Sequence, residues 1–214
     1  MNEPVETTPV VLKKYTLVDY VFQFITITAG VLIALLINGL VEWNHNRELV
    51  AQARATITRE ITDNLKELEG LPGALEKSSS EIDNVLKLAD DLLASGMSDV
   101  HTVSLGVNLP TLTSTSWQTA QQTGALSHMD YDEAQKYSGL YSRQDLFIAM
   151  QSKAIDLVAT AITFIRQTVG PEADPQDVRR FREELLLLQA NLLVIGQMGD
   201  QLLKAYREFL QSNQ

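Results

Sequence analysis

Cysteine is absent from this chain of 214 residues. Its absence excludes disulfide bonds, thiolate catalysis and cysteine-ligated metal sites. The three histidines, His45, His101 and His128, stand too far apart to form the paired ligands of a helical zinc or di-iron site. Glycine-rich phosphate loops and nucleophile elbows are also missing. We therefore predict no catalytic, cofactor-binding or metal-ligating residue and expect a protein that is not an enzyme.

Basic residues are scarce as well, with 17 Lys and Arg against 27 Asp and Glu, a net charge of −10. A nucleic-acid partner is not expected, because phosphate binding needs a clustered basic surface. The one basic cluster, Arg179, Arg180 and Arg182, is flanked by acidic residues. It is interpreted as surface ion pairing, with binding of an anionic ligand or lipid headgroup as the alternative. Two acidic pairs are interpreted as solvated helix faces: Asp90-Asp91 and Glu183-Glu184.

An uncharged apolar run occupies residues 20–41, YVFQFITITAGVLIALLINGLV. As a helix these residues would extend about 33 Å, against a hydrocarbon core of roughly 30 Å. Tyr20 and Trp43 lie where interfacial aromatics belong. A buried core helix seldom needs so long an uncharged run, and a cleaved signal peptide has a shorter apolar core. We therefore expect an uncleaved, single-pass anchor in the lipid bilayer of the cell membrane.

Positive charges flank this run nearly equally, with Lys13 and Lys14 before it and Arg47 and Arg54 after it. The positive-inside rule therefore gives no clear orientation. Long domains cross the membrane largely regardless of charge. We predict a cytoplasmic N-terminus and a domain that follows the anchor outside the cytoplasm.

Small and polar residues share one face of the apolar run, at Thr26, Gly30, Ala34 and Asn38. Such spacing lets two backbones approach closely in lipid, and an amide can hydrogen-bond across the pair. The face is a candidate homo-oligomer contact. The alternative is that such residues are simply common in membrane helices.

Helical periodicity dominates the rest of the chain. No Pro or Gly interrupts residues 40–69, so the membrane helix is expected to continue into the first soluble helix. A turn is predicted at residues 70–73. Further helices are predicted to start or stop at Gly96, Thr115, Asp130, Gly170-Pro171 and Asp174-Pro175. The helix predicted between Asp130 and Gly170-Pro171 has one apolar face, formed by Ile148, Ile155, Val158, Ile162 and Ile165.

The expected fold class is all-α: an N-terminal transmembrane helix that continues into an antiparallel helical bundle of four to five helices. Three segments are predicted: a tail at 1–19, the transmembrane helix at 20–41 and a soluble bundle domain at 42–214. The last helix has the most regular pattern, with spacings of three and four that are typical of coiled-coil packing within the chain or between chains. Its positions are Val178, Phe181, Leu185, Leu188, Leu192, Ile195, Gly199, Leu202, Tyr206 and Phe209.

Residues 97–113 break the helical rhythm. Val103, Leu105, Val107 and Leu109 alternate with small and polar residues, a period of two that predicts an extended segment with one apolar side. No second strand is predicted to pair with it. We expect it to lie across the surface of its own bundle, or alternatively to act as a lid or partner-binding strap.

Trp117 opens the short predicted helix, beside the small residues Ala120, Gly124 and Ala125. Small neighbours allow a large ring to pack closely, so Trp117 is interpreted as a core anchor. The alternative is a small-ligand pocket formed by Trp117, Tyr137 and Tyr141.

The run GVLIALLINGLVEWNHNREL at residues 30–49 resembles part of a family of uncharacterised bacterial single-pass membrane proteins. In that family the anchor ends in an IALxxNxW-like stretch and leads into a helical domain of unknown function. The stretch at 116–126 is similar to the family's Trp-containing middle segment. The matching positions are Ile33-Ala34-Leu35, Asn38, Trp43, Tyr137 and Tyr141. The resemblance implies an inner-membrane location and an architecture but no activity.

Two functions fit these predictions better than catalysis. We expect a non-enzymatic scaffold or accessory subunit that acts through a protein partner or homo-oligomer. The alternative is an extracytoplasmic ligand-sensing module with its pocket near Trp117.

Overall fold

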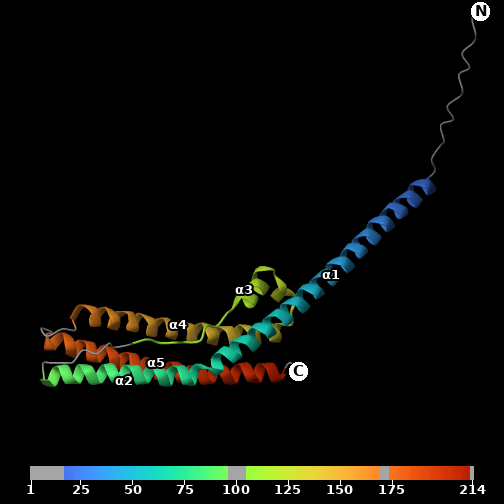
Figure 1. Ribbon diagram of the computed structural model, residues 1–214. Coiled ribbons are helices and arrows are strands. Elements are labelled where there is room, and N and C mark those ends of the chain that lie inside the picture. The colour runs from blue at the N-terminus through green and yellow to red at the C-terminus, as the bar shows by residue number, and fades with distance from the viewer. Residues whose placement is uncertain (1–16, 96–104, 169–173, 213–214) are drawn as a thin grey trace, which may run out of the picture. The chain divides into compact units, whose positions relative to one another are not determined.

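A computed structural model describes residues 17–95, 105–168 and 174–212 (Figure 1). Within these ranges all regular secondary structure is helical, as predicted, and no strand is present. The helices are α1 (Leu17–Glu69), α2 (Leu71–Ser95), α3 (Thr115–Gln122), the 3-10 helix η1 (Ala125–His128), α4 (Tyr131–Thr168) and α5 (Pro175–Ser212). The predicted stop at Gly170-Pro171 and residues 97–104 of the predicted extended segment lie outside the described residues.

The chain divides into two compact units, Met1–Glu48 and Leu49–Gln214. The boundary falls inside α1, which is helical without a break from Leu17 to Glu69. This continuity was predicted from the lack of Pro and Gly after residue 39. Between α1 and α2 only Gly70 is non-helical, so the predicted turn at 70–73 is shorter than expected. Pro72 fits in the first turn of α2, where its missing N–H has no helical partner to lose.

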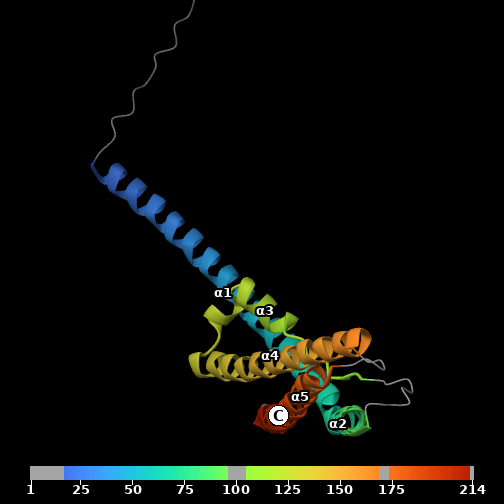
Figure 2. The same cartoon turned by 90° about the vertical axis from the view of Figure 1, so that its left-hand side faces the viewer.

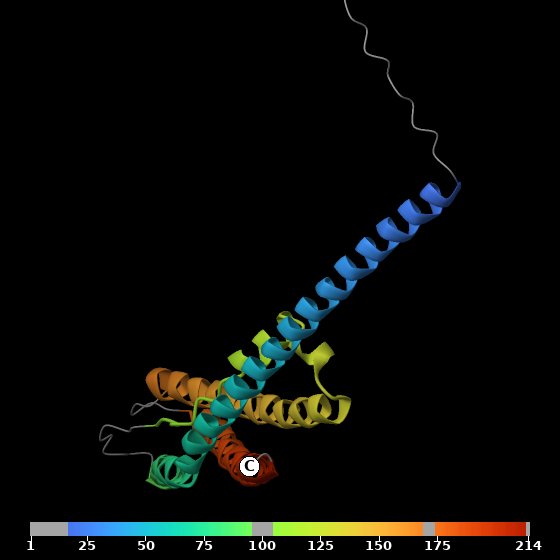
Figure 3. The same ribbon diagram turned by 90° about the vertical axis from the view of Figure 1, so that its right-hand side faces the viewer.

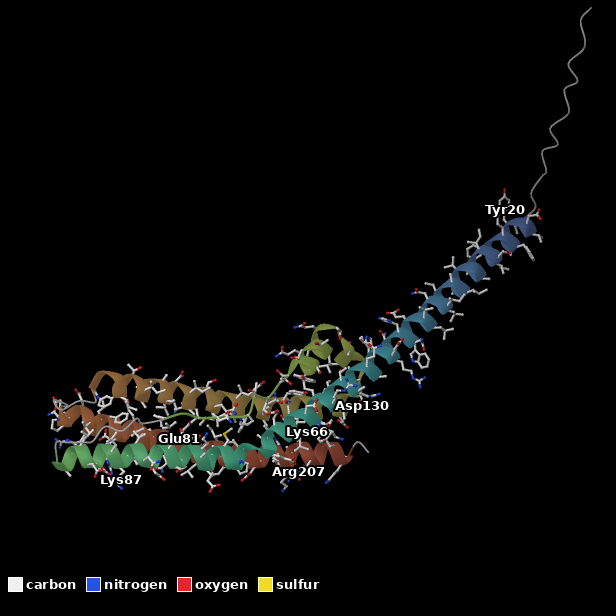
Figure 4. All side chains as sticks on the ribbon, viewed as in Figure 1. Tyr20, Lys66, Glu81, Lys87, Asp130 and Arg207 are labelled. Atoms are coloured by element: carbon white, nitrogen blue, oxygen red, sulfur yellow. The ribbon has the colours of Figure 1, made fainter. Side chains whose placement is uncertain are left out.

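The first unit exposes nearly all of its apolar side chains. From Leu17 to Trp43 the large apolar residues of α1 are 50–82% exposed. Figure 4 labels Tyr20 near the start of this helix. The most apolar 18-residue window of the helices at 17–94 has a mean hydropathy of 2.3 and no buried residue. The long N-terminal helix is therefore apolar enough to cross a membrane. By length and composition α4 passes the same test, with a mean hydropathy of 1.4.

The second unit is built around α5, which packs against both α2 and α4 (Figure 2). All ten positions of the predicted apolar pattern in α5 are buried, from Val178 to Phe209. We call this line of residues the α5 seam. Its contacts with α4 and α2 confirm that the seam packs within the chain. The structure adds Asn191 and Ala205 to the buried side of the helix.

Gly199 is the one position of the α5 seam without a side chain. A Cβ atom added there would overlap Leu71 Cδ2 and lie 3.4 Å from Phe147 Cε2. Glycine therefore allows α2, α4 and α5 to meet at this point. Gly139 on α4 is different, because a Cβ there would meet no atom within 4 Å.

The buried face of α4 differs from the prediction. Ile155 is 54% exposed, and Ile148, Ile162 and Ile165 are only partly buried, so only Val158 is buried as expected. The actual buried line includes small and amide side chains among aromatic ones. Its members are Tyr137, Leu140, Tyr141, Gln144, Phe147, Gln151, Ala154, Val158 and Ala161. The apolar pattern predicted a different face because alanine and glutamine form part of the buried line, whereas the isoleucines lie beside it.

Candidate functional site

The described part of the extended segment, residues 105–114, has neither helix nor strand. It is held by side chains of its own helices, as predicted for a segment that lies across the domain. Glu81 of α2 accepts a 3.0 Å hydrogen bond from Gly106 N, and Gln151 of α4 donates a 3.0 Å bond to Pro110 O. Figure 4 labels Glu81 below this segment. These bonds replace the pairing that a neighbouring strand would supply.

Asn64 of α1 binds both backbone groups of Thr113. Its Oδ1 accepts from Thr113 N at 2.9 Å, and its Nδ2 donates to Thr113 O at 2.7 Å. The amide side chain thus makes to Thr113 the pair of hydrogen bonds that a residue of a neighbouring β-strand would make. Gln144 of α4 also donates to Thr113 O, at 2.9 Å, and its Oε1 accepts from Tyr206 of α5 at 2.6 Å. One buried network therefore joins α1, α4, α5 and the extended segment.

Glu60 is the one carboxylate side chain that is buried among the described residues of the unit. Its Oε2 accepts from Ser116 N at 2.7 Å, and its Oε1 accepts from Trp117 N at 3.4 Å and from the Tyr141 hydroxyl at 2.6 Å. The first N–H groups of a helix lack intrahelical partners and favour a negative charge. Ser114, at the N-cap of α3, makes no side-chain cap bond. The N-terminus of α3 is thus capped by a side chain of α1, beside which α3 lies (Figure 3).

The three residues of the predicted ligand pocket come together. Trp117 stacks on Tyr141 with centroids 5.2 Å apart and an interplanar angle of 5°, and it contacts Tyr137 at 6.3 Å. Tyr137 in turn contacts Phe209 of α5 at 5.1 Å. All four rings are buried. In this structure they pack against one another, which fits the interpretation of Trp117 as a core anchor.

Burial raises the pKa of Tyr141 and of Tyr206 far above the ordinary value of tyrosine. For Tyr141, the hydrogen bond to Glu60 raises the pKa further, because an ionised phenol could not donate to a carboxylate. Both phenols therefore serve as neutral hydrogen-bond donors rather than as acids.

A hollow of about 240 Å³ opens beside Glu60. It is lined by Thr56, Arg59, Glu60, Asp63, Thr113 and Ser116. The lining is polar and carries both signs of charge. Trp117, Tyr137 and Tyr141 do not line it, so the cavity lies next to the predicted pocket residues rather than among them.

Glu60 and Asn64 were missed by sequence reasoning, although a signal was present. They lie on the same face of α1 as the buried Ile57, Ile61 and Leu68. A polar residue at an apolar position of an amphipathic helix indicates a buried hydrogen-bond partner. What the sequence could not supply was the partner, because Thr113 and Ser116 lie about 50 residues further along the chain.

The remaining predicted site residues lie in the first unit. Thr26 donates its hydroxyl to Phe22 O at 2.8 Å, and Gly30 has open space at its Cβ position. Ala34 and Asn38 are exposed, as are Thr26 and Gly30. Arg182 of the basic cluster forms a 2.7 Å ion pair with Asp90 of α2, in agreement with the surface-pairing interpretation. Among the described residues no group of three His, Asp or Glu side chains could hold a metal ion.

Comparison of the chain with protein-family models, with curated proteins and with solved structures gives no match in any of the three. The family resemblance of residues 30–49 therefore stays a prediction.

Proposed function

We propose that this protein is a membrane-anchored, non-enzymatic scaffold or accessory subunit, whose helical domain presents a surface to a protein partner. One observation carries the proposal. Five buried side chains of the second unit are hydrogen-bonded within the chain: Glu60 to α3 and Tyr141, Asn64 to Thr113, and Gln144 to Tyr206. Such a network stabilises and specifies a fold, which supports a structural role for these groups.

Residues 20–41 are the proposed single span. In α4 the apolar stretch contains Lys153 and Asp156, charges that are costly at the centre of a bilayer. Gln144 and Gln151 of α4 are also buried and hydrogen-bonded within the domain. The apolar character of α4 is therefore explained by packing against α5, whereas that of residues 20–41 has no such partner in the described chain.

We infer an antiparallel bundle for the second unit. Phe164 near the end of α4 stacks on Phe181 near the start of α5, with centroids 4.4 Å apart. Phe147, earlier in α4, lies near Gly199, later in α5. Contact positions that move in opposite directions along two helices support antiparallel packing.

Purification of the full chain from native membranes in mild detergent tests the scaffold proposal. We expect a stoichiometric membrane-protein partner that is lost when the chain is truncated after residue 48. A chain that alkaline carbonate extracts from membranes would contradict the anchor. A chain that stays in the membrane without any partner would contradict the scaffold.

The hollow beside Glu60 favours ligand sensing as the second candidate function, since its mixed charge fits a small zwitterionic molecule. A thermal-shift screen of the full chain against amino acids and related zwitterions tests it. Stabilisation that Arg59→Ala abolishes and Lys87→Ala preserves would favour sensing, because Lys87 is an exposed residue of α2. Absence of any specific shift would leave the scaffold as the better function.

A further inference from the structure

α5 has a second apolar face, which none of the described residues covers. Leu186, Leu187, Leu193 and Val194 are 40%, 60%, 68% and 40% exposed. Ala190 is exposed between them. With 3.6 residues per turn, these five positions form one stripe opposite the α5 seam. A contiguous exposed apolar stripe on a folded domain is typical of a protein contact.

The stripe is nearly symmetric about Ala190. Leu186 and Leu187 precede it by four and three residues, and Leu193 and Val194 follow it by three and four. Helical geometry places Leu186 and Leu193 on one side of Ala190 and Leu187 and Val194 on the other. Two copies related by a two-fold axis through this point would pack Leu186 of one against Leu193 of the partner subunit. They would likewise pack Leu187 against Val194 of the partner subunit, and the small Ala190 would permit close approach.

Charges at the two ends of the stripe select the antiparallel arrangement. Arg179 lies eleven residues before Ala190 and Asp200 ten residues after it, both exposed. In an antiparallel pair Arg179 of each copy faces Asp200 of the partner subunit. In a parallel pair Arg179 would face its own equivalent, and so would Asp200. Opposite charges steer association and like charges disfavour it.

We propose that the protein forms a homodimer through α5, antiparallel, with Ala190 beside the two-fold axis. The dimer goes beyond the proposed scaffold function and does not depend on it, because its residues all belong to the unit Leu49–Gln214. It is also separate from the small-residue face of residues 20–41. An isologous contact of this kind is the commonest form of homo-oligomer.

Cysteine crosslinking of the full chain tests the geometry without interference, since the natural chain has no cysteine. In detergent and in membranes, Ala190→Cys should form a disulfide-linked dimer on mild oxidation. The matched control is Lys87→Cys, an exposed position on α2 that should stay monomeric. A monomeric Ala190→Cys, or equal crosslinking of both variants, would overturn the proposal.

Charge reversal tests the orientation. Arg179→Asp or Asp200→Arg should each raise the dimer dissociation constant several-fold, because each places two like-charged pairs in the symmetric contact. The double variant Arg179→Asp/Asp200→Arg should restore the wild-type value. Sedimentation of the full chain in detergent measures all three, with circular dichroism to confirm folding. No recovery in the double variant would rule out the antiparallel register.

A final variant, Gly30→Ile/Ala34→Ile, separates this contact from association through the membrane helix. The Ala190→Cys crosslink should persist in its presence. Loss of the crosslink would assign the dimer to the membrane helix and reject the α5 contact. Persistence in a chain that carbonate extracts from membranes would support the dimer while contradicting the anchored scaffold.

Discussion

The hydroxyl of Tyr141 donates a 2.6 Å hydrogen bond to Oε1 of Glu60, and both side chains are buried. Tyr141→Phe keeps the ring that stacks on Trp117 but removes one of three donors to a buried carboxylate. We expect a loss of about 1–3 kcal/mol in the free energy of unfolding. Chemical denaturation of the full chain in detergent measures it. Tyr131→Phe, at a residue 73% exposed, is the control and should change stability little. Equal stability of the two variants would contradict the role given to Glu60.

Alkaline pH should destabilise the domain. Burial raises the pKa of Tyr141 and Tyr206 above the ordinary value of 10.0, so these phenols stay protonated in the folded protein and ionise in the unfolded chain. Their contribution is fully present below pH 10 and is lost above it, by about 1.4 kcal/mol per pH unit for each phenol. Unfolding measured at pH 9 and pH 11 should show this fall. The double variant Tyr141→Phe/Tyr206→Phe should show a smaller one, and an equal fall would refute the assignment.

Two buried asparagines should respond in opposite ways. Asn64→Ala removes both bonds to Thr113, and we expect a loss of about 1–3 kcal/mol with faster amide hydrogen exchange at residues 105–114. Asn191 is buried on α5, and its Oδ1 has no hydrogen-bond partner among the described residues. Asn191→Leu should therefore be neutral or stabilising, by up to about 1 kcal/mol. Hydrogen-exchange mass spectrometry and thermal melts check both. Slow exchange at Thr113 in Asn64→Ala would count against the amide as its anchor.

Two glycines on packed helices provide a matched pair. Gly199→Ala should destabilise the protein, because overpacking against Leu71 costs about 1–3 kcal/mol. The higher helix propensity of alanine offsets up to about 1 kcal/mol of this cost. Gly139→Ala has open space and should stabilise by about 0.5–1 kcal/mol. Thermal melts of the two variants should therefore shift in opposite directions. A shift of the same sign would mean that Leu71 moves freely out of the way.

Membrane topology can be measured at the C-terminus. With a cytoplasmic N-terminus and a single span, alkaline phosphatase fused after Gln214 should be active. A fluorescent reporter that folds only in the cytoplasm should be dark at the same site. The reverse pattern would place the helical domain in the cytoplasm. Insertion of the phosphatase after Ser95 provides the control, because a single-pass chain must give the same result there as at Gln214.

Local signals predicted much of the helical framework. The α5 seam follows from spacing alone, and Asp174 caps α5 as expected, with Oδ1 accepting from Gln176 N at 2.8 Å. Asp130 likewise caps α4 through Asp132 N at 3.0 Å. These features depend on residues close together in sequence. The cap of α3 and the support of Thr113 depend on Glu60 and Asn64, which are distant in sequence. Polar partners of that kind become visible only when the helices are in place.

The cap on α3 also has a consequence for the order in which the chain folds. α3 is eight residues long, too short to be stable alone. The acceptor for its first N–H groups, Glu60, leaves the ribosome 56 residues before Ser116. Glu60 is therefore synthesised before the segment whose N–H groups it binds. Trp117 of α3 stacks on Tyr141 of α4, so in a Trp43→Phe background its fluorescence should report when α3 and the later α4 have come together.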